Sequence, residues 1–292
     1  MGPQGAAFKS AIYRRHIMAG IRHLDLGILD GPLVLFGGPY SNAQALAALI
    51  RAAQDIGVQS GQMICTGDVV AYCGAPARSV AQMRALGCAV VAGNCEIQLG
   101  TGAADCGCGF EDGSACDLLS VGWYGFASGV LSAADKAWMA DLPDVISFQH
   151  QGARYAVIHG GLTDVARFIW PTSRAEVFAQ EWAAVEQAIG PVDHIIAGHA
   201  GVPFITCTPQ GRWINAGVIG MPPHDGQQDT RFAVLEGGEV RIENLPYDAQ
   251  GAADDMAQAG LPLGYRDGLL SGYWPSEDVL PEDLRVPPSA RG

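Results

Sequence analysis

A chain of 292 residues with 49% hydrophobic residues is long enough to bury a substantial core as one large domain or two small ones. Its 17 basic and 30 acidic residues give a formal net charge of −13, which argues against nucleic-acid binding, because that depends on a basic surface. No apolar run reaches the roughly 18 residues that span a bilayer, and residues 1–10 lack the pattern of a secretory signal. We therefore expect a cytoplasmic protein without a membrane or nucleic-acid partner.

The first part of the chain predicts repeated strand–loop–helix units. Residues 1–32 are expected to form an N-terminal extension lying on the domain. Apolar runs at residues 33–36, 62–64 and 89–92 then predict three buried strands, each ending in a glycine-containing turn, and helical patterns follow the first two turns. Successive units of this kind indicate a largely parallel sheet with crossover helices.

The middle of the chain opens with a segment that has no periodicity. Residues 98–125 are rich in glycine, serine and cysteine, and we expect an irregular lid or binding loop there. Ser173 and Glu176 form a predicted capping box that opens a helix. The other elements expected in this region are a helix at 132–142 and strands at 154–158 and 194–197.

The last third predicts hairpins and then a tail. Residues 204–207 pair with 213–216, and residues 232–235 pair with 240–242, because each pair flanks a short glycine-containing turn. The organisation we expect is therefore an extension at 1–32, a domain at 33–248 with the lid insertion at 98–125, and a C-terminal helix with a Pro-rich acidic tail at 249–292. From Trp274 onward this tail is expected to be loosely held.

Polar side chains stand at the ends of four of the predicted strands: Asp68, Asn94, His159 and His199. The carboxyl ends of parallel strands meet at one edge of a sheet, so these residues are expected to converge. A carboxylate, an amide oxygen and two imidazoles suit a divalent transition metal such as Mn, Zn, Fe or Ni. Taken singly, each residue also fits a satisfied polar group or a helix cap, but the set of four favours a metal site.

The motifs around these residues resemble those of the calcineurin-like metallophosphoesterases, and in particular the YfcE-type bacterial phosphodiesterase branch. The resemblance runs from about Leu33 to Asp248 and rests on Gly67-Asp68, Gly93-Asn94, His159-Gly160, Gly198-His199 and Asn215-Ala216-Gly217. It implies an α/β fold, a four-layer αββα sandwich. It also implies hydrolysis of a small phosphorylated substrate, a phosphomonoester or phosphodiester, with two metal ions clamping the reacting oxygens.

The sequence departs from the family's ligand pattern at three positions. Gly38 and Tyr40 replace the Asp and His of the family's first motif, and Gly201 replaces the second His of its last motif. The resemblance therefore implies one intact site, with one ion at Asp68, Asn94, His159 and His199, and an altered second site. We expect a phosphoesterase working in this way; the alternative is a non-catalytic relative that serves as a metal- or ligand-binding module.

Cysteines gather near Asn94 in the sequence. Cys95 stands where the family has a His that assists the leaving group, so we expect it in the catalytic chemistry, at the pocket mouth and with a lowered pKa. Cys106, Cys108 and Cys116 follow in the lid. For these four cysteines a second metal or thiol cluster, free thiols in a flexible lid, and a disulfide all remain open.

Two further groups have weaker signals. His23 and Asp25 carry the same side chains as the lost His and Asp ligands. They would replace those ligands if the extension folds back over the site. Arg167 and Arg174 can meet a substrate phosphate through paired hydrogen bonds, although surface salt bridges explain them equally well.

Overall fold

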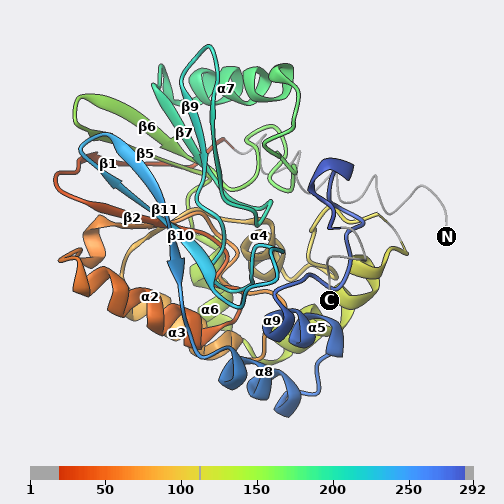
Figure 1. Cartoon of the computed structure of the whole chain (residues 1–292). Coiled ribbons are helices and arrows are strands. Elements are labelled where there is room, and N and C mark those ends of the chain that lie inside the picture. The colour runs from red at the N-terminus through yellow and green to blue at the C-terminus, as the bar shows by residue number, and fades with distance from the viewer. Residues whose placement is uncertain (1–19, 112, 287–292) are drawn as a thin grey trace.

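Two β-sheets lie face to face at the centre of the fold, with helices on both outer faces (Figure 1). The computed structural model describes residues 20–111 and 113–286. The six-stranded sheet has the order β1 (His23–Ile28), β5 (Val145–His150), β6 (Ala153–Val157), β7 (His194–Ala197), β9 (Arg212–Asn215) and β8 (Phe204–Cys207). The five-stranded sheet has the order β11 (Glu239–Leu245), β10 (Thr230–Glu236), β2 (Leu33–Phe36), β3 (Met63–Cys65) and β4 (Ala89–Val90).

The predicted strand directions are confirmed. β2, β3 and β4 are parallel neighbours, and so are β6, β7 and β9. The two predicted hairpins are the antiparallel pairs β8–β9 and β10–β11. The carboxyl ends of the parallel strands in both sheets therefore supply the loops in which ligands of such sheets bind.

The side chains of β2 point alternately into two hydrophobic cores. Leu33 and Leu35 pack between the sheets, whereas Val34 and Phe36 face the helices. A strand that is buried on both faces needs apolar side chains at every position, which explains its unbroken apolar run. The αββα layering predicted from the family resemblance is confirmed.

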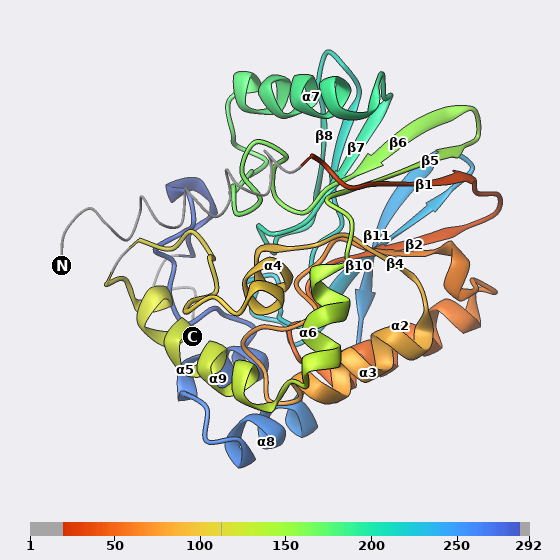
Figure 2. The ribbon, with the colours of Figure 1, turned by 180° about the vertical axis from the view of Figure 1, so that it is seen from behind.

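Helix α7 covers the outer face of the six-stranded sheet, and most of the other helices lie on the side of the five-stranded sheet (Figures 1 and 2). In the described residues, no helix is long and apolar enough to cross a membrane. The helices are α2 (Ala43–Asp55), α3 (Pro76–Leu86), α4 (Asn94–Thr101), α5 (Ala115–Val130), α6 (Ala133–Ala140), α7 (Ala175–Ile189), α8 (Ala249–Gln258) and α9 (Leu263–Ser271), with short 3₁₀ turns at Ser60–Gln62 and Glu282–Leu284.

The predicted irregular insertion at 98–125 is wrong in extent. Helix α4 continues to Thr101 and α5 begins at Ala115, so only the segment between them is irregular. The side chain of Ser114 caps α5 by accepting a hydrogen bond from the backbone of Asp117. The buried face of α5 consists of Cys116, Ser120, Trp123, Tyr124 and Ala127. Its glycines had hidden this helical spacing.

Two other expectations about local structure also change. Part of the expected N-terminal extension is β1, an edge strand that pairs in parallel with β5, while residues 1–19 lie outside the described part. The predicted capping box is wrong: Arg174 is the N-cap of α7, with no side-chain cap bond. The hydroxyl of Ser173 instead accepts a hydrogen bond from the backbone of Trp170 at 2.9 Å.

The segment after Trp274 is anchored rather than loosely held. The backbone N–H of Trp274 donates to His224 Nδ1 at 2.8 Å, and its indole Nε1 donates to the carbonyl of Pro222 at 2.7 Å. His224 Nε2 in turn lies 2.7 Å from Glu277 Oε1. The described part of the expected tail is therefore a wall of the domain; residues 287–292 lie outside it.

Candidate metal centre

The four predicted ligands converge where the two sheets meet. Asp68 follows β3, and Asn94, the first residue of α4, follows β4 after a three-residue turn. His159 follows β6 and His199 follows β7, so each sheet contributes two ligands. All four are buried, with no residue more than 8% exposed. The prediction that distant strand ends meet at this edge is correct.

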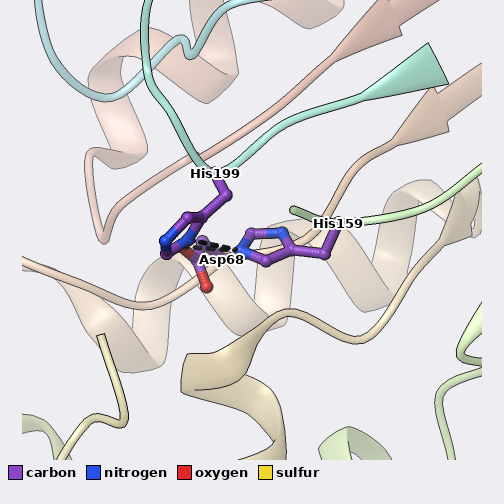
Figure 3. A group of neighbouring side chains, drawn as sticks. All are labelled: Asp68, His159 and His199. Atoms are coloured by element: carbon purple, nitrogen blue, oxygen red, sulfur yellow. Dashed lines mark hydrogen bonds and ion pairs between the residues drawn. The ribbon is translucent and has the colours of Figure 1, made fainter. Parts of the chain in front are cut away.

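The ring of His159 lies at the middle of the group. Its Nε2 is 3.1 Å from Asn94 Oδ1, 3.1 Å from His199 Nδ1 and 3.3 Å from Asp68 Oδ2. One ligand atom from each of Asp68, His159 and His199 lies within 4.8 Å of the others, and the three side chains point toward one another (Figure 3).

The chemistry of these atoms fits a divalent cation. His159 Nδ1 donates to the carbonyl of Thr66 at 2.6 Å, so Nε2 of the neutral ring carries a lone pair. That lone pair faces the oxygens of Asn94 and Asp68, which are also acceptors. A cation satisfies all of these acceptors together, and two oxygens with two nitrogens suit the borderline metals predicted from the sequence.

Protonation in the centre follows from burial and from the neighbouring charges. Burial and the charge of His159 lower the pKa of His199 to about 3, so His199 is a neutral imidazole at neutral pH. Burial alone lowers the pKa of His159, but the carboxylate of Asp68 outweighs it and the pKa is raised. The charge of His159 likewise lowers the pKa of Asp68 against the effect of burial. A proton on His159 and a metal ion therefore compete for the same acceptors.

The backbone is strained where it presents the ligands. Asp68 and His199 have positive φ angles of 56° and 60°. Side-chain-bearing residues rarely adopt this conformation, and such strain concentrates at functional sites. A Cβ on Gly67 would lie 2.8 Å from His159 Nδ1, and a Cβ on Gly93 would lie 2.5 Å from Asp68 Oδ1. Close packing of the ligands thus explains the glycine before Asp68 and the glycine before Asn94.

Glu96 supports the centre, and the sequence reasoning missed it. Its Oε2 accepts from the backbone N–H groups of Asp68 at 2.8 Å and Gly93 at 3.0 Å, and its Oε1 accepts from Val69 at 2.8 Å. Burial, with the charge of Asp68, raises the pKa of Glu96 to about 7. The available signal was an acid two residues after Asn94, in the first turn of a helix, where acids are favoured.

Contacts with three cysteine residues fix the orientation of the Asn94 side chain. Its Nδ2 donates to the carbonyl of Cys106 at 3.0 Å and lies 3.5 Å from Cys95 Sγ and 3.6 Å from Cys108 Sγ. Because the amide nitrogen is held on this side, the amide oxygen faces His159. Cys106 and Cys108 are joined by a disulfide, one of the three states that the sequence left open.

The expected position of Cys95 at the pocket mouth is wrong. Cys95 is 1% exposed, and burial together with the charges of Asp68 and Glu96 raises its pKa. The lowering expected from a bound cation stays a prediction. The backbone N–H of Cys95 donates to Asp68 Oδ1 at 3.3 Å and its thiol lies 3.5 Å from Asn94 Nδ2, so this residue packs against the centre from inside the fold. A catalytic role for the thiol stays a prediction.

The four predicted cysteines do not form one cluster. Cys116 lines a different pocket, together with Tyr265 and Ser276. Across the described residues, one group of at least three His, Cys, Asp or Glu side chains is placed to hold a metal: Asp68, His159 and His199.

Aromatic side chains lie next to Gly38 and Gly201, two of the positions where the resemblance implies lost ligands. Gly38 has a φ of 40°, and a Cβ there would lie 2.6 Å from the ring of Tyr40. The Tyr40 ring itself packs edge-on against Tyr72, with the ring centroids 4.7 Å apart. Gly201 has a φ of 76°, and a Cβ there would lie 3.1 Å from the indole of Trp274. A side chain at position 38 or 201 would therefore have a strained backbone and would require a neighbouring side chain to move.

The weaker sequence candidates lie elsewhere. His23 Nε2 hydrogen-bonds with the hydroxyl of Ser147 at 2.9 Å on β5, so it does not replace a lost ligand. Arg167 is paired with the buried carboxylate of Glu181 at 2.6 Å, and Arg174 is exposed at the start of α7. Glu181 also accepts from the backbone of Leu162 at 2.7 Å, so this pair stabilises the loop after His159.

Two facing sheets flanked by helices, with a buried donor set at their shared edge, are typical of a metal-dependent phosphoesterase. Residues 41–238 match the calcineurin-like phosphoesterase superfamily domain, which is more than half of the chain. The chain therefore belongs to this superfamily, and the predicted family is confirmed. Membership supports the expected class of enzyme, a hydrolase.

Individual proteins are similar to this chain in sequence or in fold. The chain is 23% identical over 253 residues to the uncharacterised protein MJ0912 of Methanocaldococcus jannaschii, covering 80% of this chain and 95% of that protein. It resembles the crystal structure of a metallophosphoesterase from Sphaerobacter thermophilus with a TM-score of 0.63 and 20% identity, over 84% of this chain and 100% of that one. The hypothetical protein PH1004 from Pyrococcus horikoshii gives a TM-score of 0.66 at 16% identity, over 83% and 99% of the two chains.

Proposed function

We propose that this protein hydrolyses a phosphoester bond of a small phosphorylated substrate, using one divalent transition metal held by Asp68, Asn94, His159 and His199. The observation that carries the proposal is the set of acceptor atoms around His159 Nε2, all within 3.3 Å of it. Acceptors turned toward one another in a buried site are the arrangement that a cation stabilises.

The bound cation supplies Lewis acidity toward a phosphoryl oxygen and toward water. The residues of the chain hold it and keep its surroundings fixed. Glu96 holds the loop of Asp68 through two backbone hydrogen bonds and Gly93 through a third, and Thr66 fixes the ring of His159. With a net charge of −13, the protein repels a phosphate at long range, so attraction of the substrate depends on the cation itself.

The experiment measures metal content and hydrolysis in the same samples. Protein loaded separately with Mn²⁺ or Zn²⁺ is analysed for bound metal and tested on bis(4-nitrophenyl) phosphate and 4-nitrophenyl phosphate. We expect about one ion per chain, as one complete donor set implies. Replacing either His159 or His199 with Ala should remove both the metal and the hydrolysis. The matched control is His23→Ala, because His23 is exposed and bonds only at the edge of the six-stranded sheet.

A binding module without catalysis is the second candidate, and the altered second site that the resemblance implies favours it. Tyr40 stands at one of the lost-ligand positions and Trp274 packs against another, Gly201, so the two-metal clamp of the family would be incomplete. One bound ion with no hydrolysis of either ester would support this candidate and contradict the enzyme. Hydrolysis that disappears in His159→Ala but persists in His23→Ala would support the enzyme.

A further inference from the structure

An apolar pocket lies beside His199, with a cavity volume of about 50 Å³. Its walls come from parts of the chain that are far apart in sequence: the loop of Tyr40, the turn at Gly201, Val218, helix α9 through Tyr265, and Trp274. Phe168 also lines it and packs against the ring of His199, with the ring centroids 4.4 Å apart. The pocket therefore reaches a metal ligand directly.

The pocket adjoins the altered second site that the resemblance implies. Tyr40 and Gly201 stand at two of the positions where the resemblance implies lost ligands, and both line it. A substituent on phosphorus that enters this pocket meets aromatic rings. In a two-metal site, the second cation would instead meet a charged phosphate oxygen. Burying a charged phosphate oxygen against such a wall costs free energy, whereas burying carbon is favourable.

The walls are fixed, so the pocket does not depend on a side chain moving into place. The indole of Trp274 is held by the carbonyl of Pro222, and its backbone is held by His224. On the opposite side, Tyr40 packs on Tyr72, and Tyr72 packs on Tyr265 with ring centroids 4.4 Å apart. A fixed apolar cavity selects its occupant by size.

The size of the cavity limits the occupant. A cavity of roughly 150 Å³ accepts benzene, and this pocket, at about 50 Å³, is a third of that. By volume it matches an alkyl group of about two carbons better than a phenyl ring. We propose that the preferred substrate is a phosphodiester with one short alkyl ester, whose alkyl group lies in this pocket.

This inference rests on the proposed function and narrows its substrate class. Water adds its oxygen to phosphorus while the bond from phosphorus to the leaving alcohol breaks. One proton of the water goes to the alcohol, the other goes to solvent, and the short-chain alkyl phosphate is the second product. In a diester, the alkyl ester replaces one of the charged oxygens of a monoester, and that is the oxygen which an apolar wall disfavours.

The kinetic test uses one leaving group and varies the other substituent. Metal-loaded protein is given 4-nitrophenyl phosphate, ethyl 4-nitrophenyl phosphate and phenyl 4-nitrophenyl phosphate. We expect kcat/KM for the ethyl diester to exceed the other two by at least about tenfold, since each buried methylene contributes about 0.8 kcal/mol and a phenyl ring matches the cavity less well. Equal kcat/KM values for the ethyl and phenyl diesters would overturn the inference.

Enlarging the pocket should reverse the preference. In Trp274→Ala, the phenyl diester should become the better substrate of the two diesters. Val279→Ala is the milder second variant if loss of the indole prevents folding, because Val279 lines the same pocket and is only half-buried. Trp138→Ala, a tryptophan change outside the pocket, is the matched control and should keep the preference for the ethyl diester. An unchanged preference in both enlarged variants would overturn the inference.

A binding measurement separates the inference from the proposed function. Calorimetry with diethyl phosphate, diphenyl phosphate and inorganic phosphate on metal-loaded protein needs no turnover. Tighter binding of diethyl phosphate than of the other two supports the pocket even if no ester is hydrolysed, in which case only the proposed function fails. Equal or weaker binding of diethyl phosphate overturns the inference even if hydrolysis is observed.

Discussion

Glu96 is the residue that holds the backbone beside Asp68 and Asn94 in place. It is fully buried and holds three backbone N–H groups, two from the loop that carries Asp68 and one from Gly93. Carboxylates of this kind fix the orientation of a ligand and are often nearly as important as the ligand. An amide in the same place offers only one acceptor atom, so its NH₂ group opposes one of these N–H donors.

We therefore predict that Glu96→Gln weakens metal binding by about 10- to 100-fold while the protein still folds. The dissociation constant for Mn²⁺ is measured by competition with a chelator. Glu236→Gln is the control, because that carboxylate lies on β10 with its side chain 53% exposed and should not affect the metal. Wild-type affinity in Glu96→Gln would show that the Asp68 loop keeps its position without this support.

The second prediction concerns how the affinity for metal depends on pH. The pKa of His159 is raised, and the ring must lose its proton before it binds a metal. As pH falls below that pKa, the apparent metal affinity should fall by about tenfold for each pH unit. His199 adds no second step near neutrality, because its pKa is lowered to about 3. Chelator competition at several pH values tests this, and an affinity that stays constant through the acid range contradicts it.

The third prediction concerns the lost ligands. The variant Gly38→Asp, Tyr40→His, Gly201→His restores the family's ligand residues. From the sequence alone, we expect this variant to bind close to two metal ions per chain. The structure changes that expectation. Positions 38 and 201 have positive φ and tight neighbours, which cost roughly 1–3 kcal/mol each. We now expect a lower melting temperature and still one ion by elemental analysis; two ions in a folded triple variant would contradict this.

The segment between helices α4 and α5 acts as a clamp that holds the side-chain amide of Asn94. The disulfide between Cys106 and Cys108 closes it, and the carbonyl of Cys106 accepts from the Asn94 amide. Gly107 sits between them at a φ of 60°, beside the side chain of Gln98. This left-handed backbone conformation favours glycine.

We predict that reducing the disulfide speeds metal release. A dithiol supplies two electrons and two protons, so that Cys106 and Cys108 become separate thiols and the clamp on Asn94 loosens. Mn²⁺ is the probe, because it prefers oxygen and nitrogen ligands over thiolates. Release to a chelator should be faster by roughly tenfold after reduction. The double variant Cys106→Ser, Cys108→Ser should release Mn²⁺ quickly with or without the dithiol. Equal release rates for oxidised and reduced protein would rule out the clamp.

The strand ends and the candidate ligands are predictable from the sequence, because apolar runs followed by Gly-Asp, Gly-Asn and Gly-His indicate two local features: a buried strand and a turn with close packing. Helix α5 was missed because Gly122, Gly125 and Gly129 weaken a local helical signal that tertiary packing of Trp123 overrides. The anchoring of Trp274 depends on Pro222 and His224, about fifty residues away, and no local pattern reports such contacts.

In the molecule as a whole, the metal centre joins the two sheets. Asp68 and Asn94 belong to loops of the five-stranded sheet, and His159 and His199 belong to loops of the six-stranded sheet. A cation held by all four links the two halves of the sandwich. Binding to the folded state alone stabilises a protein by about 2.7 kcal/mol when the free ligand is at 100 times its dissociation constant.

We therefore predict that Mn²⁺ or Zn²⁺ raises the melting temperature by several degrees. For domains approaching this size, about 1 kcal/mol shifts the midpoint by roughly 2–4 °C. His199→Ala should show no such shift, and His23→Ala should shift as the wild type does. The measurement is a thermal melt followed by circular dichroism. A metal that binds without raising the midpoint would mean that it binds the unfolded chain equally well.

The wall formed by Trp274 lies on a stretch of chain that follows every strand and every metal ligand. Other parts of the same pocket, including Phe168 and Gly201, come from the loops that also carry His159 and His199. A substitution at Trp274 therefore changes one wall of the proposed substrate pocket without replacing a candidate metal ligand. This position is the simplest starting point for redesigning the specificity of the protein.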